Sequence, residues 1–235
     1  MASGALPLNL YIESGAERKH NMERIICLLA GYLFGLIQSG YFYGRAHKID
    51  IRNHGSGNSG TTNALRVMGA KAGAIVFVGD FLKAFLPCMA VRLIFRGQPD
   101  MIYLLILYVG FGVILGHNYP FYLSFKGGKG IAATAGLIVA VDLWLMLLCL
   151  VVFVLIVGVT RYVSLGSLVV AAILFVWLVL FAAMGIYEVP PALRPEFYIM
   201  AGLISGQAYW RHRANIGRLI HGTENKLSVG SGKKG

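Results

Sequence analysis

Long apolar runs, separated by short polar segments, constrain the fold of this chain more than any other feature. Hydrophobic residues make up 57% of the 235 positions and charged residues only 13%, a balance far from that of soluble domains. A helix needs about 20 apolar residues to cross a bilayer, and several runs are shorter than that. The sequence predicts an all-α integral membrane protein with candidate spans Ile25–Tyr43, Ala72–Ile94, Ile102–His117, Gly130–Val141, Leu143–Val159, Ser164–Tyr187 and Phe197–Tyr209.

Three polar segments, called islands below, interrupt this apolar sequence. Island one is Asp50–Asn63 (DIRNHGSGNSGTTN), island two is His117–Gly130 (HNYPFYLSFKGGKG), and island three is Arg211–Glu224 (RHRANIGRLIHGTE). Glycine, small polar residues, His, Lys and Arg are the groups that build an anion site from backbone N–H groups and fixed cations. The islands therefore suggest that the chain acts on phosphorylated molecules at a membrane surface.

The number of spans decides whether the islands meet. Asp142 alone separates Gly130–Val141 from Leu143–Val159, so the chain has six spans if these runs merge and seven if they do not. With seven spans, all three islands fall on one side together with most of the Lys and Arg residues. Cytoplasmic loops carry such an excess. The sequence predicts seven transmembrane helices, with the N-terminus outside and the C-terminus and the islands in the cytoplasm.

The ends of the chain do not fit this pattern. Residues 1–21 carry mixed charges and no sustained period, so they are predicted to be a natural extension, a leader or a segment added by cloning. Residues 22–226 are predicted to form a single seven-span domain, and residues 227–235 a flexible tail. Asp and Glu together number only 10 and are scattered. We therefore expect no metal and disfavour a metal-dependent phosphotransferase.

Islands one and two each have a functional and a plainer interpretation. In island one, Gly55, Gly57 and Gly60 can adopt positive φ and turn several N–H groups toward one anion. Its neutral donors and nearby cations are Ser56, Asn58, Thr61, Thr62, Asn63, Arg52 and Arg66. In island two, Lys126 and Lys129 flank glycines before an apolar run, where a helix N-terminus would favour an anion. The alternatives are a glycine-rich turn and a loop marked by cytoplasmic lysines.

Several further features of the sequence concern single residues or pairs of residues. His212 and Asn215 are three apart and share one face of a helix, whereas Arg211 and Arg213 are typical of a stop-transfer cluster. Glu224 could pair with one of the arginines of island three. His117 ends a span, and a histidine there is more often a packing residue than a catalyst. Within an apolar run, where ionisable residues are costly, we expect a structural pair that helps to position island one, formed by Asp80 and Lys83.

Taken together, these segments resemble the bacterial acyl-phosphate:glycerol-3-phosphate acyltransferases, integral membrane enzymes that begin phospholipid synthesis. The resemblance covers Met22 to about Lys226 and rests on D-I-R-N-H-G-S-G-N-x-G-T-T-N, G-H…F-K-G-G-K-G and R-H-R-x-N-I-x-R-L…G-T-E, in that order. It implies seven spans in the bacterial inner membrane and an active site at the cytoplasmic face. It also implies acyl transfer from acyl phosphate to the 1-hydroxyl of glycerol 3-phosphate, which gives lysophosphatidic acid.

The resemblance also implies residue roles and partners. Ser56 and Arg66 would belong to the active site, Lys126–Gly130 to a phosphate loop with Lys129 as its main cation, and His212, Asn215, Ser167 and Glu224 to the same site. The predicted catalytic residues are Ser56, Arg66, Lys129, His212 and Asn215. The predicted phosphate- or substrate-binding residues are Gly55, Gly57, Asn58, Gly60, Asn63, Lys126, Gly127, Gly128 and Ser167. The predicted structural residues are Asp80, Lys83, His117 and Glu224.

The expected partners are the two substrates and membrane lipid, with no cofactor and no nucleic acid. An upstream enzyme that forms acyl phosphate is a further candidate partner. Two departures from the family pattern stand beside the motifs. Leu36 and Gln38 replace the serine and proline of G-S-I-P-x-G, and Ile131-Ala132-Ala133 replaces V-A-T.

Two other functions explain part of this pattern. A transporter of phosphorylated solutes would need the spans, glycines and cations, but its site is expected near the middle of the membrane. A structural protein that binds anionic lipid through basic loops leaves the pairing of His212 and Asn215 unexplained.

Overall fold

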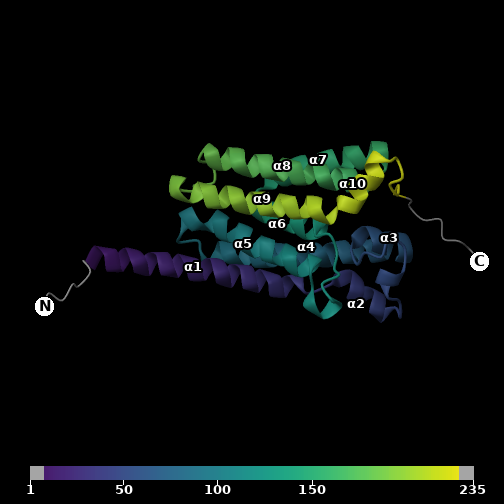
Figure 1. Ribbon diagram of the computed structural model, residues 1–235, viewed down its shortest axis with the longest axis horizontal. Coiled ribbons are helices and arrows are strands. Elements are labelled where there is room, and N and C mark those ends of the chain that lie inside the picture. Colours follow the sequence, from purple (N-terminus) through teal and green to yellow (C-terminus); the bar gives the residue numbers. More distant parts are fainter. Residues whose placement is uncertain (1–7, 228–235) are drawn as a thin grey trace, which may run out of the picture.

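The computed structural model describes residues 8–227 and shows a bundle of long, roughly parallel or antiparallel helices (Figure 1). The long helices are α1 (Leu8–Gly35), α4 (Ala70–Ile94), α5 (Pro99–Asn118), α6 (Ile131–Val141), α7 (Leu143–Thr160), α8 (Val163–Ala183) and α9 (Arg194–Arg211). The short ones are α2 (Ser39–Ala46), α3 (Thr61–Met68) and α10 (Arg213–Ile220), with 3-10 turns at Ile51–Asn53, Phe121–Leu123 and Pro191–Leu193. Within the described residues there is no strand, which confirms the all-α prediction.

Five segments are long and apolar enough to cross a membrane. They are His20–Ala46, Ala70–Ile94, Pro99–Leu123, Leu143–Thr160 and Val163–Ala183, and the shorter apolar helix Ile131–Val141 accompanies them. Large hydrophobic side chains are exposed along α1, α4, α7 and α8. A surface of this kind needs lipid around it. The chain is therefore a multi-pass integral membrane protein.

Helix α5 lies at the centre of the bundle and is buried along most of its length. Glycines bring its backbone close to α1: a Cβ added to Gly35 would lie 2.3 Å from Val113 O, and one added to Gly116 would lie 2.2 Å from Tyr32 O. Small residues at such a contact let two membrane helices approach closely. The paired course of α1 and α5 (Figure 1) follows from these glycines.

Asp142 lies between the apolar runs Gly130–Val141 and Leu143–Val159, which the sequence alone could have joined into one helix. Its backbone is extended, and its Oδ1 accepts hydrogen bonds from the N–H groups of Trp144 (2.7 Å) and Leu145 (3.2 Å), which caps α7. Its Oδ2 accepts hydrogen bonds from Tyr187 (2.9 Å) and Trp177 (3.2 Å). Asp142 thus ends α6 and begins α7, and the two runs form separate helices.

The first predicted span, Ile25–Tyr43, is not one continuous helix. Helix α1 ends at Gly35 and α2 begins at Ser39. At the break, the buried Gln38 amide donates to three backbone oxygens, those of Gly35 (3.2 Å), Gly116 (3.3 Å) and His117 (3.0 Å). At its other end α1 begins at Leu8, inside the segment predicted as an extension, while residues 1–7 and 228–235 lie outside the described part of the chain.

Candidate functional site

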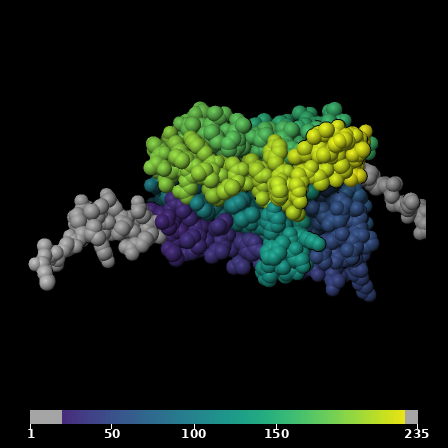
Figure 2. Space-filling view, in the orientation of Figure 1, coloured from purple at the N-terminus to yellow at the C-terminus, as the bar shows by residue number. Residues whose placement is uncertain are grey.

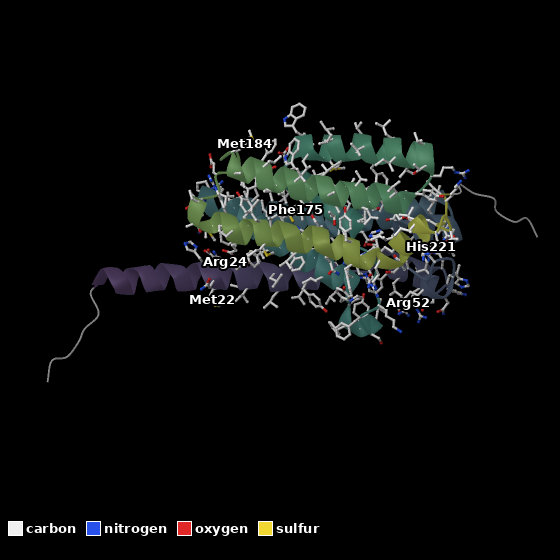
Figure 3. The ribbon with its side chains drawn as sticks, turned by 45° about the horizontal axis from the view of Figure 1, so that its top comes forward. Met22, Arg24, Arg52, Phe175, Met184 and His221 are labelled. Carbon is white, nitrogen blue, oxygen red and sulfur yellow. The ribbon has the colours of Figure 1, made fainter. Side chains whose placement is uncertain are left out.

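A cavity of about 440 Å³ opens at the end of the bundle where the three islands lie. Figure 3 shows nitrogen-bearing side chains at this end around Arg52 and His221, whereas Met22 and Arg24 lie along α1 toward the other end. The polar residues that line the cavity include Ser56, Asn58, Asn63, Arg66, Lys129, Ser164, Ser167, Arg211, His212, Asn215, Arg218 and Glu224. Side chains far apart in sequence therefore converge here, as the seven-span arrangement predicted.

Four helices begin at the wall of this cavity: α3, α6, α8 and α10. Residues of their first turns line it, and none of the four has a side-chain hydrogen bond at its N-cap. The first N–H groups of a helix have no partner within the helix and carry partial positive charge. Four such ends around one space favour the binding of negatively charged groups.

Cationic side chains add to this positive field. Arg66 and Lys129 are half-buried in the cavity wall, and Lys129 Nζ donates a hydrogen bond to Asn215 Oδ1. Burial lowers the pKa of Lys129 to about 8, against the opposing effect of Glu224. The ammonium group is thus charged in neutral solution and loses its charge only as the pH rises through about 8.

The two carboxylates in the cavity wall already have cationic partners. Asp80 Oδ1 lies 2.8 Å from Lys83 Nζ, and Glu224 Oε2 accepts a hydrogen bond of 2.7 Å from Arg218 Nε. Glu224 Oε1 also accepts hydrogen bonds from Asn215 (2.6 Å) and Ser164 (2.9 Å). Burial raises the pKa of Glu224, but these hydrogen bonds lower it by more, so the net shift is downward. The cations in the cavity wall outnumber its two carboxylates, so the wall carries net positive charge.

His212 is buried in the cavity wall in its neutral form. Its Nδ1 lies 2.8 Å from Ala208 O, an arrangement that places the ring proton on Nδ1 and leaves Nε2 as an acceptor. Burial first, and then the charge of Lys129, lower the pKa of His212 to about 4. His212 can therefore accept a hydrogen bond at neutral pH without adding positive charge. Asn215, one helical turn further on, lines the same cavity.

The side chain of Asn63 fixes the backbone of island one through hydrogen bonds. Asn63 Oδ1 accepts a hydrogen bond from the N–H of Ser56 (2.8 Å), and its Nδ2 donates to the carbonyls of Ile51 (3.1 Å) and His54 (3.0 Å). Gly55 has a φ of +61° and Gly57 one of +71°, a region that favours glycine. Asn58 Oδ1 accepts from the N–H of Gly60 at 2.8 Å. These contacts hold exposed Ser56 at the cavity. Gly55 and Gly57 allow the backbone to make the turn on either side of it.

Island two differs from the expected phosphate loop. The N–H of Gly127 donates to Asn118 O (3.2 Å) and that of Gly128 to His117 O (3.1 Å), so neither is free for a phosphate. A Cβ on Gly128 would lie 1.9 Å from His117 Nε2, which explains the glycine. Lys126 is exposed and does not line the cavity. The backbone that does line it is the start of α6, at Gly130–Ala132.

Three of the predicted structural residues, Asp80, Lys83 and His117, lie in one buried network, whereas Glu224 is bound to Arg218, Asn215 and Ser164. Lys83 Nζ contacts Asp80 Oδ1 (2.8 Å) and His117 Nδ1 (2.7 Å) and donates to Ile37 O (2.6 Å). Ser39 Oγ, at the start of α2, donates to Asp80 Oδ1 at 2.9 Å. The network therefore ties α4 and α5 to the break before α2. Ser167 is also buried and donates to Val163 O at 2.8 Å.

Arg211, Arg218 and Ser164 line the cavity but were not among the predicted site residues, and Gln38, which lies outside the cavity wall, was not expected to support it. Arg211 was assigned to a stop-transfer cluster, yet its guanidinium donates to the carbonyls of Gly128 (2.7 and 3.0 Å) and Gly127 (3.0 Å) and so fixes the turn before Lys129. Gln38 Oε1 accepts from Ser59 Oγ at 3.2 Å, so Gln38 joins island one to the ends of α1 and α5. The sequence signal for Arg211 was its place beside His212; for Gln38 it was an amide within an apolar run.

Comparison with known proteins gives consistent matches. The sequence model of a family described as "Glycerol-3-phosphate acyltransferase" matches residues 25–222. A protein of that name from Clostridioides difficile is 39% identical over 217 residues, which cover 86% of this chain and 95% of the relative. One from Mycoplasma pneumoniae is 34% identical over 225 residues, 87% of this chain and 94% of the relative.

Solved structures match as well. A crystal structure of PlsY (YgiH), an integral membrane glycerol 3-phosphate acyltransferase, in its glycerol 3-phosphate form has a TM-score of 0.74 and 34% identity. The match covers 87% of this chain and 96% of that one. The lysophosphatidic acid form gives a TM-score of 0.72 and 31% identity, with coverage of 88% and 96%.

Proposed function

Because this chain belongs to the glycerol-3-phosphate acyltransferase family, we propose that it acylates the 1-hydroxyl of sn-glycerol 3-phosphate with acyl phosphate as the donor. The products are lysophosphatidic acid and phosphate, and the reaction would supply the first intermediate of phospholipid synthesis. The observation that carries the donor assignment is the cavity itself. It is surrounded by four helix N-termini without side-chain caps and by cations that outnumber the carboxylates, which suits two phosphorylated substrates rather than one.

The cavity wall also has an apolar part. Phe77 of α4 and Phe153 and Val157 of α7 line the same space as the polar residues. An acyl phosphate has an anionic head and an apolar tail. Its binding site therefore needs a polar surface and an apolar surface next to each other. Ser164 and Ser167 of α8 lie in the same wall and can contact polar parts of either substrate.

We assign the phosphates to two sub-sites. Ser56, Arg66 and the start of α3 would hold one phosphate, and Lys129 with the start of α6 the other. The start of α6 takes the place of the Gly127 and Gly128 N–H groups, which have protein acceptors.

The chemistry needs alignment and charge stabilisation more than a strong base. The glycerol hydroxyl oxygen attacks the acyl carbon, and the bond from that carbon to the phosphate oxygen breaks. N–H groups and cations stabilise the developing oxyanion, while His212 Nε2 and Asn215 orient the hydroxyl. The departing phosphate, with a second pKa of about 6, takes the proton. Because this leaving group is already good, neutral His212 suffices as a hydrogen-bond acceptor.

We further propose seven membrane crossings in the bacterial inner membrane, with the N-terminus outside and the C-terminus and the cavity at the cytoplasmic face. The two ends of the described chain lie at opposite ends of the bundle (Figure 1), which supports an odd number of crossings. The separation of α6 from α7 at Asp142 supports seven. The position of the cavity at one end, rather than midway, disfavours the transporter alternative.

The proposed donor is tested with purified protein in lipid nanodiscs. Acyl phosphate and glycerol 3-phosphate together should give lysophosphatidic acid and release phosphate, whereas acyl-CoA should give neither. The reason is that the cavity is built for a phosphate leaving group. Mass spectrometry of the lipid product and a phosphate assay check both outcomes. Turnover of acyl-CoA at a comparable rate would contradict the assignment of acyl phosphate as the donor. It would not affect the assignment of the chain to its family.

Activity is expected to survive thorough treatment with EDTA. Both carboxylates in the cavity wall are engaged by cations, Asp80 by Lys83 and Glu224 by Arg218, and are poorly suited to bind Mg²⁺. Among the described residues, no group of three His, Cys, Asp or Glu side chains is arranged as a metal site. The measurement is the initial rate before and after chelation. Loss of activity that Mg²⁺ restores would contradict a site made of N–H groups and cations.

A further inference from the structure

An aromatic patch lies beside the catalytic end of the bundle and plays no part in the cavity. It consists of Tyr41 and Phe42 on α2 and of Phe121, Tyr122 and Phe125 in the connection between α5 and α6. Phe42, Phe121 and Phe125 are 52%, 58% and 59% exposed. The ring centroids of Phe42 and Tyr122 are 6.3 Å apart, and those of Phe121 and Tyr122 are 5.8 Å apart. Two chain segments thus form one continuous ring surface.

The backbone of this connection presents Phe125 outward. Ser124 and Phe125 have φ values of +53° and +59°, two consecutive non-glycine residues in the left-handed region. Such a conformation is unfavourable for a bulky side chain and persists where the surroundings impose it. Here the N–H of Phe125 donates to Pro120 O at 3.0 Å and that of Lys126 to Leu123 O at 3.1 Å. The turn is therefore closed in a form that exposes a large apolar ring.

Exposed cations accompany the rings. Arg45, Lys48 and Lys126 are all exposed at this end of the bundle. The nearby carboxylate, Asp50, is engaged by Arg52 at 2.7 Å, a contact that lowers the pKa of Asp50 to about 2. The patch and its surroundings therefore carry net positive charge.

The patch projects sideways from the bundle. In Figure 1 the connection and α2 lie next to each other near the end of α1, and Figure 2 shows the teal connection at the surface beside the blue segment that contains α2. A sideways projection at the level where α1 ends would lie in the plane of the membrane surface. Aromatic rings concentrate at that depth, and anionic headgroups attract Lys and Arg there.

We propose that the aromatic patch is an interfacial anchor that binds anionic phospholipid. Its rings enter the boundary between headgroups and acyl chains, and Lys126, Arg45 and Lys48 bind lipid phosphates. Lys126 would thus bind the phosphate of a lipid and not that of a substrate. Since Lys126 directly precedes the turn that carries Lys129, the anchor would set the depth of the catalytic loop.

The depth of the patch can be measured without any assay of catalysis. The three native cysteines are buried, so a Phe125→Cys variant can be labelled with an environment-sensitive fluorophore. In nanodiscs of phosphatidylcholine and phosphatidylglycerol, its emission should shift to the blue, and brominated lipid should quench it. The matched control is His221→Cys, at an exposed position of the same end, which should show neither effect. Equal emission and quenching at the two positions would overturn the proposal.

The charged part is tested with the same probe. For labelled Phe125→Cys, quenching should rise as the phosphatidylglycerol fraction rises, and Arg45→Gln with Lys126→Gln should remove that dependence. The control is Lys71→Gln, an exposed lysine at the start of α4, which should leave it intact. The phosphate that Lys126 binds could belong to a lipid or to a substrate. The KM for glycerol 3-phosphate, measured in neutral lipid, distinguishes these two sources. A rise of tenfold or more in Lys126→Gln would show that this lysine binds substrate and would overturn its lipid role.

Discussion

Replacing Lys129 with alanine should raise the KM for one phosphorylated substrate by about ten- to a hundredfold. Lys129 is the half-buried cation at the start of α6, and a charge-assisted hydrogen bond is worth roughly 1.5–3 kcal/mol. A contact with phosphate that exists in both the ground state and the transition state affects KM more than kcat. Steady-state kinetics with each substrate varied in turn give the result and identify the phosphate that Lys129 holds.

Two further variants make this result specific. Lys126→Ala removes a lysine three residues away that lies outside the cavity, so its KM values should stay near those of the parent protein. Lys129→Arg keeps a charge that does not titrate. In the parent, the KM for that substrate should rise with pH above about 8, because the lowered pKa of Lys129 lets it lose its proton there; in Lys129→Arg this rise should vanish. Unchanged kinetics in a folded Lys129→Ala would remove Lys129 from the site.

Replacing Asp80 with alanine should destabilise the protein by roughly 3–5 kcal/mol, the usual cost of leaving one member of a buried ion pair without its partner. Lys83 would keep its contacts with His117 and with Ile37 O but would lose the carboxylate 2.8 Å away. Thermal unfolding in detergent, followed by circular dichroism, measures the change. The thermal midpoint should fall clearly below that of the parent protein.

The control for this prediction is a double variant. Asp80→Leu combined with Lys83→Met removes both charges and keeps apolar volume, so it should be more stable than either single variant. Single variants as stable as the parent protein would mean that the pair does not hold α4 and α5 to the break before α2. Wild-type activity in the unstable Asp80→Ala, assayed well below its midpoint, would confine the role of Asp80 to stability.

Much of the fold could be predicted from hydrophobic runs and charge. The runs Ala72–Ile94, Leu143–Val159 and Ser164–Tyr187 correspond to α4, α7 and α8, because long apolar segments have few alternatives to a membrane helix. The meeting of the three islands also followed from the pattern of spans. The break after Gly35 did not, because Leu36 and Ile37 continue the apolar run and the polar contacts of Gln38 are long-range.

The parts of the site that could not be predicted from the sequence depend on which backbone N–H and carbonyl groups already have hydrogen-bond partners within the protein. Gly127 and Gly128 have the composition of a phosphate loop, but their N–H groups are taken by the carbonyls of Asn118 and His117. No local pattern reveals this, since the acceptors belong to the end of another helix. Arg211 was misassigned for the same reason: a basic residue after an apolar run has the same local appearance whether it faces headgroups or binds carbonyls.

The contact between Lys129 and Asn215 has a consequence for how the binding of one substrate affects the binding of the other. In the structure, the ammonium group occupies Asn215 Oδ1, the oxygen that is otherwise suited to accept a hydrogen bond from the glycerol hydroxyl. A phosphate that draws Lys129 toward itself releases this oxygen, while Glu224 keeps the amide oriented through Asn215 Nδ2. Occupancy of one sub-site would then prepare the other, and the two substrates would bind with positive synergy rather than independently.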